Sequence, residues 1–168
     1  LRGMPILECL LPDKTMGDKT SIEAYDVHYT LKGPEKSPSI ACLGVLSNIQ
    51  GYRADILIAD DVESKKNAGT GPQREKLIDI TRDFTSICSA GDIIYLGTPQ
   101  SIDSIYNGLP SRGYDVRVWT GRFPTNDEMQ NYGSNLAPSI VKMAKEHPAL
   151  QHGGGPLGDR GRATDDII

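Results

Sequence analysis

The segment Ala54–Asp61, with the sequence ADILIADD, constrains the fold of this chain more than any other feature. Residues 56–59 are all apolar, so both of the faces that alternate along an extended strand are apolar. A strand of this kind is typical of a parallel sheet that is covered on both sides. Parallel strands need a long crossover connection, which is usually a helix. The segment therefore predicts a buried parallel strand within an α/β fold.

The residues after this strand predict the crossover. Thr70-Gly71-Pro72 opens a helix, because proline suits the first helical turn. Apolar residues then recur three or four positions apart, as on the side of a helix that faces a core; they are Leu77, Ile80, Phe84 and Ile87. Asp92–Leu96 predicts a second buried strand, Asp103–Leu109 a short helix and Tyr114–Trp119 a third strand. This alternation of strands and helices predicts right-handed crossovers and a mainly parallel sheet.

Weaker patterns predict the elements nearer the two ends of the chain. Apolar and polar residues alternate over Ser21–Tyr29, which is typical of a strand with one face in water. Ala137-Pro138 begins a further helix, and His147-Pro148 ends it. A run of three glycines and a proline follows and breaks regular structure. We therefore expect residues 1–150 to form one folded portion and residues 151–168 to form a linker.

Composition excludes several classes of protein. The 18 Lys and Arg against 22 Asp and Glu give a net charge of −4, so the whole domain carries no strongly basic footprint for nucleic acid. Three scattered cysteines favour free thiols in a reducing compartment, and the first residues lack the pattern of a secretion signal. No apolar run is long enough for a membrane span. Since the chain begins at Leu1 and not at methionine, we expect a preceding part.

Three carboxylates stand where the Ala54–Asp61 strand leaves the sheet: Asp60, Asp61 and Glu63. The carboxyl ends of the strands form the ligand crevice of an open α/β sheet. Four apolar residues followed by two carboxylates resemble the Walker B element of phosphate-loop ATPases. Asp60 is then placed to hold Mg²⁺, while Asp61 or Glu63 orients and deprotonates the attacking water. A two-metal nuclease site and a solvated acidic loop are the alternatives.

The second buried strand ends in Gly97-Thr98-Pro99-Gln100. A hydroxyl at this point can hydrogen-bond a phosphate or its water, so Thr98 is a candidate sensor of the γ-phosphate of ATP. Gln100 is a candidate for passing that state to the following helix. An ordinary turn, in which proline ends the strand and threonine bonds to the local backbone, is the alternative interpretation.

Arg53 precedes the acidic strand and therefore lies at its amino end, away from the crevice. It can reach a nucleotide only across a subunit boundary, as an arginine finger. The alternative is an exposed arginine that pairs with Asp55. A phosphate-binding loop of the form G-x-x-x-x-G-K-[ST] does not occur in these 168 residues. Either the chain is a non-hydrolysing relative of ATPases, or that loop lies upstream of Leu1.

Taken together, three motifs resemble the large terminase subunit of tailed bacteriophages, in particular the podovirus type. They are GYRADILIADDVE at 51–63, REKL at 74–77 and IIYLGTPQ at 93–100, and the resemblance covers most of the chain. It implies a RecA-like, additional-strand P-loop NTPase fold, which is a three-layer sandwich with a mainly parallel sheet. The chain would be the second half of that ATPase domain, with the Walker A strand missing and the start of the interdomain linker present.

The resemblance also implies a function. Large terminase subunits use ATP and Mg²⁺ to package double-stranded DNA, and they carry a separate nuclease. Asp60 takes the Mg²⁺ position of Walker B and Asp61 the catalytic carboxylate position, although many ATPases have glutamate there, which keeps Glu63 a rival. Thr98 falls in the coupling motif, and Arg53 matches an arginine proposed to act in trans.

The implied partners are double-stranded DNA, the portal protein, the small terminase subunit and further copies in a ring on the procapsid portal. The site of action is the host cytoplasm, with no membrane involved. A non-catalytic module that docks to the portal is a further alternative. The fragment alone should neither hydrolyse ATP nor cleave DNA. Because the missing strand would lie between two strands of this chain, we expect the fragment to be unstable or to associate through the gap.

Overall fold

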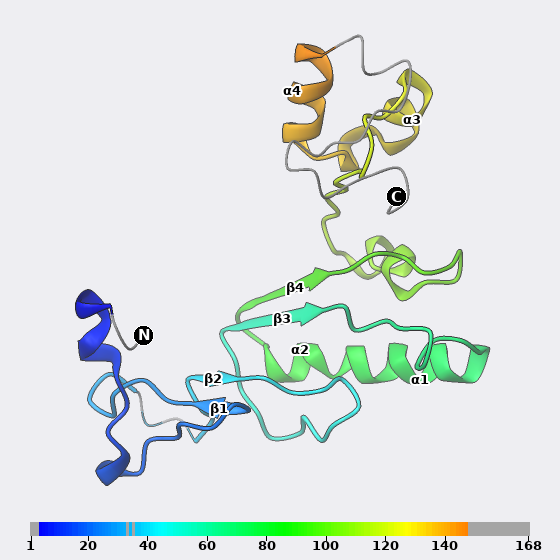
Figure 1. Cartoon of the computed structure of the whole chain (residues 1–168). Coiled ribbons are helices and arrows are strands. Elements are labelled where there is room, and N and C mark those ends of the chain that lie inside the picture. Colours follow the sequence, from blue (N-terminus) through cyan, green and yellow to red (C-terminus); the bar gives the residue numbers. More distant parts are fainter. Residues whose placement is uncertain (1–3, 33, 35, 148–168) are drawn as a thin grey trace. The chain divides into compact units, whose positions relative to one another are not determined.

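The computed structural model describes residues 4–32, 34 and 36–147. The chain has a mixed α/β structure and divides into two compact units, Leu1–Asn107 and Gly108–Ile168. Figure 1 traces the chain and labels its main helices and strands. The first unit contains both of the small sheets, and the second is mostly helical and turn-like in its described part.

The centre of the first unit is a strand–helix–strand crossover. Strand β3 (Ile56–Asp60) runs parallel to β4 (Asp92–Leu96), with Ile56 opposite Asp92 and Asp60 opposite Leu96. Helix α1 (Gly71–Arg82) and the short α2 (Phe84–Ile87) connect the strands and lie along one side of them (Figure 1). Thr70 and Gln73 form a capping box at the start of α1. The two strands, their parallel pairing and the helix predicted from Gly71 are therefore confirmed.

The two faces of the β3–β4 pair differ in their cover. Leu57, Ala59, Ile93 and Tyr95 lie in the apolar core that includes Leu77 and Phe84 of the helices. The other face is exposed: its aliphatic side chains are Ile56, Ile58, Ile94 and Leu96, and each keeps 42% to 63% of its surface in solvent. The sequence predicted cover on both faces, and within the described residues only one face is covered. Association through a gap stays a prediction.

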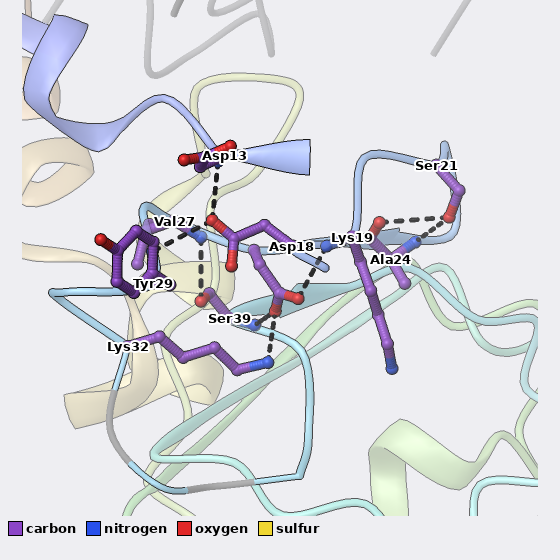
Figure 2. Close-up of polar contacts among 10 residues, drawn as sticks. Asp13, Asp18, Lys19, Ser21, Ala24, Val27, Tyr29, Lys32 and Ser39 are labelled. Carbon is purple, nitrogen blue, oxygen red and sulfur yellow. Dashed lines mark hydrogen bonds and ion pairs between the residues drawn. The ribbon is translucent and has the colours of Figure 1, made fainter. Parts of the chain in front are cut away.

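The segment before β3 is built from turns and very short strands. Strands β1 (Ala24–Tyr25) and β2 (Ile40–Ala41) pair antiparallel, after the 3-10 helices η1 (Pro5–Leu10) and η2 (Lys14–Met16). The longer strand expected over Ser21–Tyr29 is not formed. The reason is local: Ser21 and Ala24 exchange hydrogen bonds in a turn, and the Asp26 N–H donates to the Lys19 carbonyl at 2.8 Å. Figure 2 shows the polar contacts that hold this segment.

The second unit corrects the third predicted strand. Tyr114–Trp119 forms no strand; only Val118 makes a bridge, to Leu136. The Val118 N–H donates to the Asn135 carbonyl at 2.7 Å, and its carbonyl accepts from the Ala137 N–H at 2.9 Å. The backbone of Val118 is thus satisfied by the turn before the next helix, and the parallel sheet has two strands in the described part of the chain.

The remaining helices of the second unit are short. They are η4 (Pro110–Arg112), α3 (Asn126–Tyr132), η5 (Gly133–Asn135) and α4 (Pro138–Glu146). Helix α4 begins and ends where the sequence predicts. The helix expected over Asp103–Leu109 is instead a 3-10 helix, η3 (Ile105–Gly108), at the unit boundary. The predicted linker 151–168 lies outside the described residues. Among the helices that are described, none has the length and apolar character to cross a membrane.

Candidate functional site at the carboxyl ends of β3 and β4

The register of β3 and β4 brings the two predicted strand-end motifs together. Asp60 is paired with Leu96, and the Asp61 N–H donates to the Leu96 carbonyl at 3.0 Å. The acidic strand end therefore lies directly beside Gly97 and the turn that follows it. The Asp60 and Asp61 residues are exposed at this edge. Two carboxylates and the turn after β4 thus share one edge of the sheet.

Asp61 has an unusual backbone conformation. Its φ is 45°, and in the described part of the chain it is the only non-glycine residue with a positive φ. Asp and Asn adopt this left-handed region more readily than most side chains. The chain turns at Asp61: this residue is exposed, while the next two, Val62 and Glu63, are buried.

Glu63 consequently leaves the edge that Asp60 and Asp61 share. It is 6% exposed, and its Oε2 accepts hydrogen bonds from the Ser104 hydroxyl at 2.7 Å and the Ile105 N–H at 2.9 Å. Its Oε1 is buried, and no donor among the described residues reaches it. The sequence predicted that the three carboxylates lie together. In the structure Asp60 and Asp61 are exposed and Glu63 is buried.

The turn after β4 is open to solvent. Thr98 and Gln100 are both exposed, and the Gln100 side-chain amide donates to the Thr98 carbonyl at 3.3 Å. This contact joins the two residues in one local turn. It differs from the alternative interpretation of the motif, which expected threonine to bond to the local backbone. Residue Thr98 lies near the same end of the strands as the two exposed carboxylates, because Gly97 follows the residue that pairs with Asp60.

Tyr106 is a member of this region that the sequence did not reveal. Its hydroxyl donates to the Leu96 carbonyl at 3.3 Å, and a Cβ at Gly97 would overlap its phenol ring. Burial raises the pKa of Tyr106, an effect that the backbone N–H of Glu63 opposes and the charge of Asp61 reinforces. The one available signal was Gly97, since a glycine at a strand end often marks a close approach.

Arg74 links α1 to the loops around the site. Its guanidinium donates to the Ala68 carbonyl at 3.1 Å and pairs with the Asp103 carboxylate at 3.3 Å. Asp103 directly precedes Ser104, so this ion pair acts on the same segment that Glu63 binds. The arrangement around the strand ends is therefore held from both α1 and β3.

Sequence comparison shows which known protein this chain is similar to. Over 142 residues the chain is 36% identical to the terminase large subunit of Enterobacteria phage T3, which covers 82% of this chain and 24% of that protein. The chain is homologous to part of a terminase large subunit. It spans about a quarter of the length of this curated relative. No family model matches the chain.

Arg53 stands apart from the edge in this terminase homologue. It precedes β3, so it lies at the opposite end of the strand from Asp60. Its backbone N–H donates to the Ser37 hydroxyl at 2.9 Å, and its guanidinium donates to the Tyr52 carbonyl at 2.7 Å. Within the described residues no ion pair joins it to Asp55. The structure therefore does not bring Arg53 together with Asp60 and Asp61.

The groups at the edge suit one part of a nucleotide site. Exposed carboxylates such as Asp60 and Asp61 provide the hard oxygen atoms that Mg²⁺ prefers, and the Thr98 hydroxyl is a donor for a phosphate or water. In the described residues, no three His, Cys, Asp or Glu side chains gather to form a complete metal site. A glycine-rich phosphate loop is absent from the sequence. The edge thus offers oxygen ligands without a complete metal site among the described residues.

Proposed function

We propose that this chain is the second half of the ATPase domain of a terminase large subunit, and thereby part of an ATP-driven motor that packages double-stranded DNA into procapsids. The homology supports the family assignment. The observation that carries the ATPase role is the register of β3 and β4, which brings Asp60 and Asp61 beside the Gly97–Gln100 turn. The proposed fold is a RecA-like P-loop NTPase sandwich, to which a further segment contributes the Walker A strand.

Each edge residue has a role in this proposal. Asp60 holds the Mg²⁺ that accompanies ATP, and Asp61 orients the attacking water and accepts its proton. The Mg²⁺ ion supplies neutralisation of the charge that develops on the phosphate oxygens. Thr98 and Gln100 sense the γ-phosphate. Arg53 is directed at ATP held by a neighbouring subunit, because it lies at the wrong end of β3 for its own.

The partners of the proposed motor follow from the same assignment. They are double-stranded DNA, the portal protein, the small terminase subunit and further copies of the large subunit, which form a ring at the procapsid in the host cytoplasm. The buried position of Glu63 disfavours a two-metal nuclease centred on Asp60, Asp61 and Glu63, because that reaction needs several carboxylates facing the same ions.

The simplest test is the DNA sequence upstream of the Leu1 codon. An in-frame G-x-x-x-x-G-K-[ST] motif supports the proposal, because it supplies the missing phosphate loop. An in-frame stop codon directly before Leu1 contradicts it and favours a non-catalytic module.

The biochemical test uses the complete product of the gene that encodes this chain. Asp61→Asn should abolish ATP hydrolysis, since asparagine keeps the size of the side chain and tolerates the positive φ while it removes the charge. Asp79→Asn, in an exposed pair with Arg82 on α1, is the matched control and should retain activity. Full ATP hydrolysis by both Asp60→Asn and Asp61→Asn would contradict the proposal. Mn²⁺-dependent DNA cleavage that Asp60→Asn abolishes would favour the nuclease.

A further inference from the structure

Glu63 connects two segments that are distant in sequence. It follows β3, and both of the groups that donate to its Oε2 belong to residues 104 and 105, beyond β4. Ser104 is 4% exposed and Ile105 is 4% exposed, so the whole contact is shielded from water. A buried carboxylate that accepts two hydrogen bonds in such surroundings fixes its partners firmly, because losing it would leave two buried donors unpaired.

The segment Ser104–Tyr106 is also tied to β4 and α1. The Tyr106 hydroxyl binds the Leu96 carbonyl, and Arg74 binds Asp103 immediately before Ser104. By contrast, residues 97–103 are all exposed. The loop that carries Thr98 and Gln100 is therefore an exposed loop with two fixed ends, one at β4 and one at the segment that Glu63 holds.

We propose that Glu63 is a positioning residue: by binding Ser104 and Ile105 it fixes the far end of the 97–103 loop and so holds Thr98 and Gln100 beside Asp60 and Asp61. This inference rests on the proposed ATPase function. It assigns to Glu63 a role other than that of the water-activating base.

The geometry argues for this role on two grounds. A general base must come within hydrogen-bond reach of the proton that it removes. One oxygen of Glu63 is occupied by Ser104 and Ile105, and the other is buried without a partner among the described residues. Asp61, two residues earlier, is exposed at the edge itself.

The decisive variant is Glu63→Gln in the complete gene product, with steady-state ATP hydrolysis as the measurement. Glutamine keeps an acceptor oxygen for Ser104 and Ile105 but cannot act as a base. We expect Glu63→Gln to keep kcat within about threefold, and Glu63→Ala to lower it about 10- to 100-fold through misplacement of the loop. Ser104→Ala should lower kcat in the same direction but less, because the Ile105 N–H remains. Asp61→Asn is the inactive reference.

Amide hydrogen exchange of the complete gene product provides a readout that is independent of activity. Glu63→Ala should speed exchange in peptides that cover residues 101–108, since the Ile105 N–H loses its acceptor, whereas Glu63→Gln should leave them unchanged. Peptides from α1 serve as the internal control for folding. Unchanged exchange at 101–108 in Glu63→Ala would overturn the positioning role.

The two proposals fail in different ways. If Glu63→Gln abolishes ATP hydrolysis, Glu63 is a catalytic group and the positioning role is wrong. This holds whether Asp61→Asn is inactive or active. The proposed ATPase function stands in both cases. If the unaltered complete protein hydrolyses no ATP, the proposed function fails, and the exchange experiment still decides whether Glu63 holds the segment.

Discussion

Among the described residues of the first unit, Asp26 and Glu63 are the buried carboxylates, and their hydrogen-bond partners differ. Asp26 is 2% exposed and all of its acceptors are engaged: Oδ2 accepts from the Lys19 N–H at 2.9 Å, and Oδ1 accepts from the Ser39 N–H at 3.1 Å. Lys32 pairs with Oδ1 at 2.8 Å. Glu63 has partners at one oxygen only. Figure 2 labels Lys19, Lys32 and Ser39 and draws their polar contacts as dashed lines.

The surroundings explain the difference. Asp26 is the only buried residue among those described between residues 4 and 50, so this segment has almost no apolar core and is organised around one charge. Glu63 directly follows Val62, which belongs with Ala59 and Leu77 to an apolar core. From this difference we expect Asp26 to determine whether its segment folds, and Glu63 to determine where the 97–103 loop lies.

The largest effect is expected from Asp26→Ala. It leaves Lys32 and two backbone donors without their acceptor, which costs about 4 kcal/mol for a broken buried pair. Hydrogen exchange over residues 10–41 measures the loss. Asp79→Ala breaks an exposed ion pair with Arg82 and should cost under about 1 kcal/mol. Equal effects of the two variants would show that Asp26 does not organise the segment.

The next effect is expected from Leu77→Ala in α1. Leu77 is 1% exposed, and truncation of a buried leucine costs about 3 kcal/mol through lost burial and the cavity that remains. Exchange should rise in β3, α1 and β4 and stay unchanged at residues 10–41. Loss of protection in both regions at once would show that they unfold together and would contradict the expected difference between them.

Glu63→Ala should have a smaller effect on stability, about 2 kcal/mol, because Ser104 and Ile105 lose an acceptor in a buried place. Urea denaturation followed by circular dichroism measures it. Glu63→Gln is the matched control, since it keeps the acceptor and should cost less. An effect as large as that of Asp26→Ala would assign the two carboxylates the same structural role.

Lowering the pH should have the smallest effect on stability, and it should destabilise the segment around Asp26 first. Burial alone would raise the pKa of Asp26, but hydrogen bonds from Lys32, Lys19 and Ser39 outweigh it and lower the pKa below its ordinary value. Its contribution to stability is therefore complete above the ordinary pKa of about 3.9, and it is lost as the pH falls through the lowered pKa. Hydrogen exchange over residues 10–41, measured at a series of pH values and corrected for the intrinsic exchange rate at each pH, should show this loss of protection. In Asp26→Asn the acid dependence of that region should be reduced.

The sequence predicted what depends on local pattern. The apolar run of β3, the spacing of α1 and the proline at the start of α4 are properties of neighbouring residues, and the structure confirms the elements that they indicate. The strand expected at Tyr114–Trp119 failed because a strand needs a paired neighbour, and the turn before α4 satisfies Val118 instead.

Side-chain direction was the other gap. The pattern of Ser21–Tyr29 did not identify Asp26 as a buried group, yet the structure buries it with three donors. Glu63 is separated from Asp60 and Asp61 after a left-handed backbone angle at Asp61, and the spacing of residues in the sequence does not reveal such an angle. The roles of Asp60, Asp61, Thr98, Gln100 and Arg53 remain predictions.

The positive φ of Asp61 limits which residues can replace it in this protein. A left-handed residue other than glycine costs about 1–2 kcal/mol, less for Asp and Asn because their short polar side chains bond locally. Glutamate at position 61 would bear more of that penalty, so a switch from the shorter to the longer carboxylate requires a change in the turn as well. The backbone conformation at position 61 therefore restricts which amino acids can replace Asp61, independently of any catalytic role.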